Sequence, residues 1–264
     1  MTAIAAFTRG EGPDVVLVHG ALGDYRQWRP IGDALQSSFR VTEVSRRYHW
    51  PNPMPAPDAS YTYEGHRDDL LEFLAPFDRT VHLVGHSYGA GIALLTALAA
   101  PAKLRTLTVI EPAFGSLLDV GNDALAEELA IRSAMLERTQ HLSGAGDHET
   151  AARVLIDWLQ ASEQGFASLP PAVQAGLLEN AQSVGPTFAA PAPNVMCGGL
   201  RSLQLPALVL YGAHTRPFFR VIAERAAACL PKGTLDAVPG CGHMSIVEDP
   251  GAVASRLRAF LVQN

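Results

Sequence analysis

The sequence predicts a doubly wound, mostly parallel α/β sheet with an all-helical cap inserted between two of its strands. Short β-branched runs alternate along the chain with longer amphipathic stretches, and this alternation is typical of βαβ units. Several of the short runs are apolar on both faces, as strands are when both faces of a sheet are covered. The 264 residues are enough for one such domain with a sizeable core.

The predicted core elements follow from these patterns. The predicted strands are Asp14–Val18, Phe39–Ser45, Thr80–Val84, Arg105–Ile110, Ala207–Tyr211 and Thr234–Val238. The predicted core helices are Trp28–Gln36, Glu64–Ala75, Tyr88–Ala100, Arg216–Leu230 and Pro250–Val262.

One segment departs from the alternation. From about Gly115 to Leu203 only helical patterns occur, followed by a Pro/Gly-rich loop. The helices are expected near Asn122–Leu142, Glu149–Gln164 and Pro171–Gln182, and the loop spans Gly185–Gly199. We expect residues 1–114 and 204–264 to form the core and residues 115–203 to form a cap over the strand ends, where ligands bind in open α/β sheets. Packed surface helices are the alternative, and a Pro-rich loop at Pro51–Pro57 is expected to line the same rim.

Composition and charge exclude several classes of protein. With 48% hydrophobic and 17% charged residues the chain is not of the disordered class. The 20 Lys and Arg against 26 Asp and Glu, without a basic run, argue against a nucleic-acid partner. No run reaches the roughly 18 apolar residues of a membrane span, and no basic region precedes the apolar N-terminal patch. We therefore expect no membrane partner, a cytoplasmic location, and a monomer or homodimer.

The three cysteines, Cys197, Cys229 and Cys241, are widely spaced and form no CxxC pair. This spacing suggests neither a disulfide framework nor a zinc site. Cys241 lies two residues before a histidine, which would suit a thiol nucleophile, but a small buried filler is the expected role. No histidine pair forms an HExxH metal-binding motif, so no metal is expected.

The motif that carries the chemistry is Gly85-His86-Ser87-Tyr88-Gly89, a G-x-S-x-G sequence. It directly follows an apolar strand and opens a helix rich in small residues, and a nucleophile elbow has this strand–turn–helix setting. The flanking glycines permit the strained turn, and the helix N-terminus favours developing negative charge. Ser87 is the predicted nucleophile, and an ordinary Gly-rich turn is the alternative.

A serine hydroxyl needs a base, and the base is expected downstream of the elbow. His243 in Gly240-Cys241-Gly242-His243-Met244, after the last predicted strand, is that base. An oxyanion hole needs two backbone N–H groups. We assign them to Tyr88 and to Ala21, which follows the first strong strand in His19-Gly20-Ala21, with Leu22 as the second choice.

On these motifs the chain resembles the α/β-hydrolase fold superfamily. The resemblance covers nearly the whole chain: HGALGDYRQW, GHSYGAG, GAHTRPF and PGCGHMSIVEDP. The segments SRRYHWPNP, HLVGHSYGAG and VIEPAF are similar to a bacterial branch usually described only as α/β-fold hydrolases. It implies a serine-nucleophile hydrolase of the esterase or lactonase kind that needs no cofactor.

The catalytic acid departs from the usual family pattern. Most members carry an Asp after the strand that precedes the last one, but here Thr215 stands at that position. Glu111 ends the strand Arg105–Ile110, the sixth strand in the family's count, and some members, including dehalogenases and zearalenone-type lactonases, place their acid there. We therefore assign Glu111 as the acid. A buried carboxylate paired with Arg216 is the alternative role for it, and Glu248 and Asp249 are alternative acids.

The predicted reaction is hydrolysis of a small to medium, largely apolar carboxylic ester or lactone through an acyl-enzyme on Ser87. Expected pocket walls are apolar side chains: Trp28, Phe114, Leu117, Leu118, Trp158, Phe188, Phe218 and Met244. Two other functions stay open. One is a C–C bond hydrolase or non-hydrolytic lyase or cyclase on the same scaffold, and the other is a receptor for a hydrophobic ligand, which only the missing carboxylate at Thr215 favours.

Overall fold

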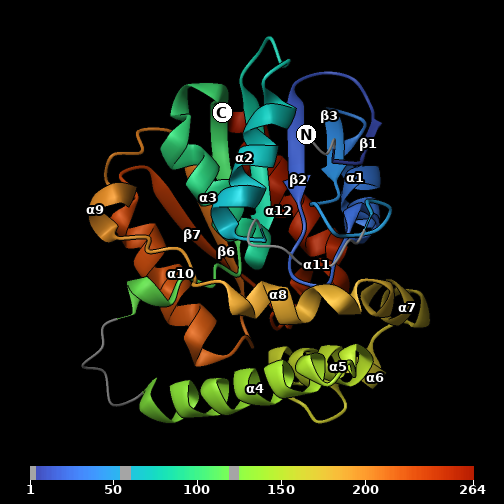
Figure 1. Ribbon diagram of the computed structural model, residues 1–264. Coiled ribbons are helices and arrows are strands. Elements are labelled where there is room, and N and C mark those ends of the chain that lie inside the picture. Colours follow the sequence, from blue (N-terminus) through green and yellow to red (C-terminus); the bar gives the residue numbers. More distant parts are fainter. Residues whose placement is uncertain (1–3, 54–60, 119–124) are drawn as a thin grey trace.

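The computed structural model describes residues 4–53, 61–118 and 125–264. They form a seven-stranded sheet in the order β1-β3-β2-β4-β5-β6-β7, with helices on both faces (Figure 1). Every neighbouring pair is parallel except β1 and β3, which run antiparallel. The predicted doubly wound, mostly parallel fold is confirmed.

All predicted strands are present, with ends shifted by one or two residues. The strands are β1 Ala6–Arg9, β2 Asp14–Val18, β3 Arg40–Val44, β4 Val81–His86, β5 Leu104–Ile110, β6 Ala207–Gly212 and β7 Gly233–Val238. Strand β1 was not predicted. It is a four-residue edge strand that is mostly exposed, so it lacks the continuous apolar run of the central strands.

The core helices cover the two faces of the sheet and enclose two apolar clusters. They are α1 Arg29–Leu35, α2 Tyr63–Leu74, α3 Tyr88–Ala99, α10 Pro217–Cys229, α11 Ser245–Glu248 and α12 Pro250–Gln263. Side chains of α2, α3 and α10 belong to one cluster, which continues into the insertion. Side chains of α1 and α12 belong to the other. The sheet is therefore buried on both faces, as its apolar strands require.

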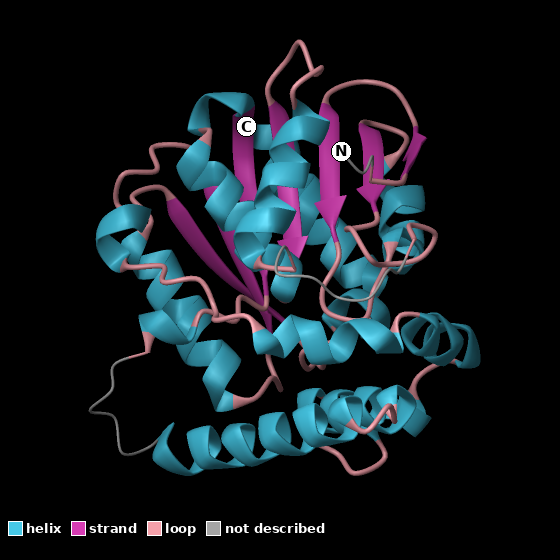
Figure 2. Ribbon diagram, viewed as in Figure 1, coloured by secondary structure: helices cyan, strands magenta, loops and turns pink. Residues whose placement is uncertain are grey.

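Between β5 and β6 the described residues contain helices and no strand. These helices are α4 Ala126–Gly144, α5 His148–Leu159, α6 Gly165–Ser168, α7 Pro171–Glu179, α8 Val184–Ala189 and α9 Cys197–Leu200. In Figure 2 the arrowheads of the central strands point toward this helical layer. The insertion therefore lies at the carboxyl ends of the strands.

In this part of the chain the structure differs from some of the predicted boundaries. The expected loop Gly185–Gly199 contains part of α8 and of α9. Pro186 does not prevent α8, because it falls in the first turn, where a proline is tolerated. The first residues of the expected helix Asn122–Leu142 and most of the loop Pro51–Pro57 lie outside the described residues.

Polar contacts hold the insertion on the core. The fully buried Asn180 donates from Nδ2 to Asp24 Oδ2 at 2.9 Å and accepts from the Trp50 N–H at 2.8 Å. Arg26 bridges Asp24 and Glu179, at 2.7 and 2.6 Å. Each buried polar atom of Asn180 is thus satisfied across the boundary, so separating the two layers would leave it unpaired.

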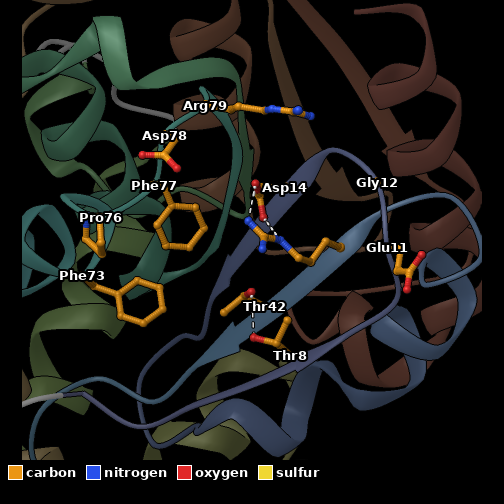
Figure 3. A pocket seen from close by; sticks show the side chains of 11 residues that line it. Thr8, Glu11, Gly12, Asp14, Thr42, Phe73, Pro76, Phe77, Asp78 and Arg79 are labelled. Carbon is orange, nitrogen blue, oxygen red and sulfur yellow. Dashed lines mark hydrogen bonds and ion pairs between the residues drawn. The ribbon is translucent and has the colours of Figure 1, made fainter.

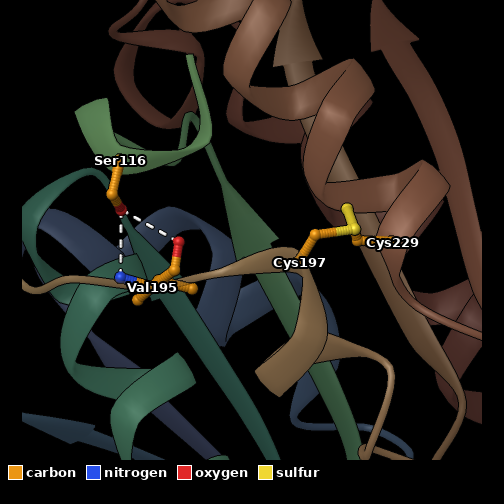
Figure 4. The surroundings of a disulfide bond; sticks show 4 residues. All are labelled: Ser116, Val195, Cys197 and Cys229. Atoms are coloured by element: carbon orange, nitrogen blue, oxygen red, sulfur yellow. Dashed lines mark hydrogen bonds between the residues drawn. A yellow bond between two sulfur atoms is a disulfide. The ribbon is translucent and has the colours of Figure 1, made fainter. Parts of the chain in front are cut away.

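A disulfide corrects the expectation drawn from the cysteine spacing. Cys197 at the start of α9 and Cys229 at the end of α10 are bonded, with Cα atoms 5.2 Å apart (Figure 4). Near it, Ser116 Oγ accepts from the Val195 N–H at 3.0 Å and donates to the Val195 carbonyl at 2.9 Å. The return of the insertion is therefore tied covalently to a core helix. Cys241 is free and buried, in the role of a filler.

Reduction of this disulfide should lower stability measurably. The bond closes a loop of 32 residues, and constraining a loop of that size in the unfolded chain stabilises by about 2–4 kcal/mol. We expect urea unfolding of the wild type to shift by that amount when dithiothreitol is added. The double variant Cys197→Ala/Cys229→Ala should start at the lower stability and not respond to reductant.

Cys241→Ala is the matched control, since it removes the free thiol and leaves the disulfide. It should keep the full response to reductant. Equal stability of oxidised and reduced wild type would contradict the prediction.

Candidate active site

The candidate site lies where the strand order of the sheet reverses. From the central strand β2 the chain goes to β3 on one side and then to β4 on the other. In open α/β sheets the crevice outside the carboxyl ends at such a switch point is where ligands bind. Gly20 and Ala21 follow β2, and Ser87 follows β4, so the two segments border this crevice.

The turn at Ser87 has the strained geometry of an elbow. Ser87 has φ +52°, in the left-handed region that non-glycine residues rarely occupy, and is followed at once by α3. A Cβ on Gly85 would lie 2.3 Å from the Gly89 carbonyl oxygen, and one on Gly89 would lie 2.3 Å from that of Val18. Both glycines are therefore required for β2, β4 and α3 to approach so closely.

Ser87, His243 and Glu111 form a continuous hydrogen-bonded chain. His243 Nε2 lies 2.9 Å from Ser87 Oγ, and His243 Nδ1 lies 3.0 Å from Glu111 Oε2. Both His243 and Glu111 are fully buried, whereas Ser87 is partly exposed. The His243 carbonyl accepts from His86 Nε2 at 2.9 Å, and the Phe219 ring lies 4.1 Å from the imidazole. The imidazole is thus held on several sides.

The Glu111 carboxylate is satisfied by donors from the neighbouring strand ends. Its Oε1 accepts from the Gly212 N–H at 2.5 Å, and its Oε2 accepts from Thr215 Oγ1 at 2.7 Å as well as facing His243. Glu111 itself has φ +54°. Thr215 is the position at which the usual family pattern has an acid. Here its hydroxyl instead orients the carboxylate of Glu111.

The alternatives considered for the acid have other partners. Arg216 pairs with Glu128 at 2.6 Å and not with Glu111. Glu248 accepts from the Gly242 N–H at 2.6 Å, and Asp249 caps α12 through the Ala252 N–H at 2.8 Å.

The peptide group between Gly20 and Ala21 is fixed through its carbonyl oxygen. The Gly20 carbonyl accepts from Arg46 Nη2 at 2.9 Å and from His19 Nδ1 at 2.8 Å. In a planar trans peptide the N–H points opposite to the carbonyl, so the Ala21 N–H points away from Arg46. Ala21 lines the same cavity as Ser87 and Tyr88, and Leu22 does not. Neither the Ala21 nor the Leu22 N–H has a partner among the described residues.

Arg46 is a buried cation surrounded by neutral acceptors. Its backbone N–H donates to His19 Nε2 at 3.0 Å, and its guanidinium faces His49 Nε2 at 3.0 Å and His66 Nε2 at 3.2 Å. Its Cζ lies 4.6 Å from the centre of the Tyr88 ring. Burial first, and then the charge of Arg46, hold the pKa values of the three histidines well below the usual one. All three are therefore neutral and can accept from Arg46.

Ser87 opens into a small, mainly apolar cavity of about 40 Å³. It lies between the core and helices α4, α5 and α8 of the insertion. The lining residues are Ala21, Tyr63, Ser87, Tyr88, Ala113, Arg132, Met135, Leu136, Leu155, Trp158, Leu159, Phe188, Phe218 and Phe219.

Three predicted wall residues, Trp158, Phe188 and Phe218, line this cavity. The others are corrected: Trp28, Phe114, Leu117, Leu118 and Met244 do not line it. Trp28 is fully buried in the cluster on the α1 and α12 face of the sheet, and Phe114 packs against Gly91 of α3. Their side chains are taken up by the core, which an apolar residue type cannot reveal by itself.

Sequence reasoning missed Arg132 and the apolar residues of α4. The signal was present, because Arg132, Met135, Leu136 and Thr139 are spaced by three and four residues and so share one face of a helix. Met135 and Thr139 on that face are buried. A charged residue within a buried stripe was the feature to notice.

Two larger hollows lie elsewhere. One of about 570 Å³ is lined by the starts of β2 and β3, where Asp14 pairs with Arg40 at 2.5 Å and Thr8 lies 3.0 Å from Thr42 (Figure 3). It lies at the amino ends of β2 and β3, whereas Ser87 follows the carboxyl end of β4. The other, of about 440 Å³, lies between α7 and the segment Leu22–Pro30. Neither contains Ser87, His243 or Glu111.

Within the described residues no group of three or more His, Cys, Asp or Glu side chains is placed to hold a metal ion. In the same part of the chain no helix is both long and apolar enough to cross a membrane.

Comparison of the sequence with known proteins finds one matching family and several similar enzymes. The sequence model described as "Alpha/beta hydrolase family" matches residues 15–256. The carboxylesterase YbfK of Bacillus subtilis is 24% identical over 98% of this chain and 84% of its own length. The 2-succinyl-6-hydroxy-2,4-cyclohexadiene-1-carboxylate synthase of Serratia proteamaculans is 27% identical over 99% of both chains.

Among solved structures, a hydrolase from Pseudomonas aeruginosa aligns with a TM-score of 0.80 at 22% identity, covering 98% of this chain and 94% of its own. At that identity the likeness shows the fold alone.

The buried histidines should make the protein sensitive to mild acid. Five of them, His19, His49, His66, His82 and His86, have pKa values lowered chiefly by burial, to about 4 for His82 and about 3 for His86. Below pH ~6.5 the unfolded chain binds protons that the folded chain does not, so stability falls as the pH falls toward 4. Each histidine contributes up to about 1.4 kcal/mol per pH unit.

Glu43 acts in the opposite direction, since burial raises the pKa of its carboxyl to about 7. The net effect is still a loss, measured as the free energy of urea unfolding between pH 7.5 and 5. His82→Gln should make this dependence shallower by one group, and the same change at the exposed His214 should not alter it. A stability that is constant over this range would contradict the assignment of neutral histidines.

Proposed function

The chain belongs to the alpha/beta hydrolase family, and on that premise we propose that it is a serine hydrolase that cleaves a carboxylic ester or lactone through an acyl-enzyme on Ser87. The observation that carries the proposal is the hydrogen-bonded chain from Ser87 Oγ through His243 to Glu111. A nucleophile, a base and a group that orients the base are the parts that acyl transfer needs.

In the first step, Ser87 Oγ attacks the carbonyl carbon while its proton passes to His243 Nε2. The Tyr88 and Ala21 N–H groups stabilise the oxyanion of the tetrahedral intermediate. Glu111 keeps the Nδ1 proton of His243 in place and stabilises the imidazolium that forms. The intermediate collapses as His243 gives its proton to the leaving alkoxide oxygen.

In the second step, water attacks the acyl-enzyme, and His243 removes a proton from that water. A second oxyanion forms in the same position and collapses to release the carboxylic acid. Ser87 recovers its proton from His243, so the enzyme returns to its starting state. Each proton transfer passes through Nε2, which explains why the tautomer fixed by Glu111 matters.

We also propose that residues 115–203 act as a cap. Helices α4, α5 and α8 of this segment supply about half of the cavity walls. The cavity volume of about 40 Å³ is far below the roughly 300–1,000 Å³ of a typical small-molecule site. An ester of the proposed size would therefore need the cap helices to move apart from the core.

The apolar walls Trp158, Phe188, Phe218 and Phe219 favour a small to medium substrate with a largely apolar body. The esterase relative supports ester hydrolysis. The synthase relative, aligned over nearly its full length, keeps a lyase reaction on the same scaffold as the second candidate. Turnover of p-nitrophenyl esters at ordinary enzymatic rates favours the first candidate, and an intact but esterolytically inert protein favours the second.

The serine assignment predicts stoichiometric labelling by a fluorophosphonate. Ser87 Oγ attacks the phosphorus because His243 can accept its proton, so intact-mass analysis should find one adduct per chain. Ser87→Ala should give none. Labelling of Ser87→Ala at the wild-type level, or no labelling of folded wild type, would contradict the assignment.

The acid assignment predicts that Glu111→Gln lowers kcat by at least about 100-fold. The Gln amide can still accept from Gly212 through its oxygen. Its NH2 group would then face His243 Nδ1 and favour the tautomer with the proton on Nε2, which cannot accept from Ser87. The measurement is steady-state hydrolysis of a p-nitrophenyl ester, with circular dichroism to check the fold.

Glu248→Gln is the control, since it changes the nearby carboxylate that was the alternative acid. It should retain most of the wild-type kcat. If Glu248→Gln were the inactive variant and Glu111→Gln the active one, the acid would be misassigned.

A further inference from the structure

Among the described residues, one cationic side chain lines the cavity at Ser87, that of Arg132 of α4. The rest of the lining is apolar or aromatic, apart from Ser87 itself and the phenols of Tyr63 and Tyr88. Arg132 is half-buried there, so part of its hydration is lost, and removing a charge from water is costly unless it is paired. An anionic partner for Arg132 would therefore offset the cost of removing its charge from water.

Arg132 has no anionic partner in the described part of the chain. Its Cζ lies 4.8 Å from the centre of the Phe218 ring, and no hydrogen bond or ion pair joins it to a described residue. Glu128, one helical turn before it, is fully engaged by Arg216 through two bonds of 2.6 and 2.9 Å. Burial lowers the pKa of the Arg132 guanidinium, which is consistent with a desolvated and unpaired cation.

A second, independent group points to the same region. The indole N–H of Trp158 is buried and has no hydrogen-bond acceptor among the described residues. Trp158 also lines the cavity, and its ring packs against Phe218, with centroids 6.3 Å apart. Phe218 thus contacts both Arg132 and Trp158. Buried donors without partners are uncommon in folded proteins, and a bound ligand or water is one explanation for such a donor.

We propose that Arg132 and Trp158 form a subsite for a carboxylate carried by the substrate, so that the preferred substrate is an ester or lactone with one free carboxylate at a distance from the scissile bond. The inference rests on the proposed serine hydrolase function. A carboxylate would accept from the guanidinium and from the indole N–H, and so satisfy both donors at once. A single arginine in a cavity of this size fits a monoanion better than a phosphate, which usually meets several cations.

The subsite lies on the cap, whereas Ser87 and the oxyanion donors lie on the core. A substrate that binds both would connect the two layers. Binding energy at the remote carboxylate would then position the ester carbonyl against Ser87, and would contribute to kcat as well as to KM. Arg132 is in this sense a specificity-determining residue.

The test compares two esters of similar length, neutral p-nitrophenyl hexanoate and anionic mono-p-nitrophenyl glutarate, on wild type, Arg132→Met and Arg132→Lys. The ratio of kcat/KM for the glutarate over the hexanoate should fall about 10- to 100-fold in Arg132→Met, as expected for loss of a charge-assisted hydrogen bond. Arg132→Lys should keep part of the preference. Arg138→Met, an exposed arginine on the same helix, is the control and should leave the ratio unchanged.

A second measurement does not depend on turnover. Glutarate should bind to Ser87→Ala by calorimetry and at least 10-fold more weakly to Ser87→Ala/Arg132→Met. Equal binding to both, or an unchanged kcat/KM ratio in Arg132→Met, would overturn the subsite. Fluorophosphonate labelling distinguishes failure of the subsite from failure of the serine hydrolase proposal. If the wild type and Arg132→Met are both labelled but neither prefers the anionic ester, the subsite is wrong and the hydrolase proposal stands. If no variant is ever labelled but glutarate binding is lost with Arg132, the subsite stands and the hydrolase proposal is wrong.

Discussion

The site is organised around one buried carboxylate, that of Glu111. It has no contact with solvent, so its charge can persist only if donors surround it. Those donors come from Gly212 at the end of β6, from Thr215 in the turn that follows it, and from the turn after β7, which carries His243. A single side chain therefore fixes the ends of three neighbouring strands relative to one another, and the imidazole inherits that fixed position.

The opposite side of the site is fixed by a buried cation. Arg46 holds the Gly20 carbonyl, while three neutral histidines serve as its acceptors. Because a peptide is planar, holding the carbonyl behind the loop also sets the direction of the Ala21 N–H in front. Glu111 and Arg46 thus have a similar role on opposite sides of the site. Glu111 orients the N–H of the His243 ring, and Arg46 orients the backbone N–H of Ala21. Neither side chain lines the cavity at Ser87.

Local patterns were sufficient to predict the six parallel strands and the elbow, but not the exposed edge strand β1, because buried parallel strands and a Gly-x-Ser-x-Gly turn are short and self-contained. They also led to Ser87 and His243, which follow predicted strands, whereas Glu111 was assigned through the resemblance to a family in which some members place the acid there. They failed where the outcome depends on packing between distant segments. Cys197 meets Cys229 only because α9 returns onto α10, and the place of Trp28 in the core depends on which face α12 covers.

The pairing of Glu111 with Thr215 has an evolutionary consequence. Strands β5 and β6 are neighbours, so a carboxylate at the end of either one can face the same nitrogen of His243. Moving the acid from Glu111 to position 215 would therefore require no change of fold, only the exchange of two side chains that already contact each other.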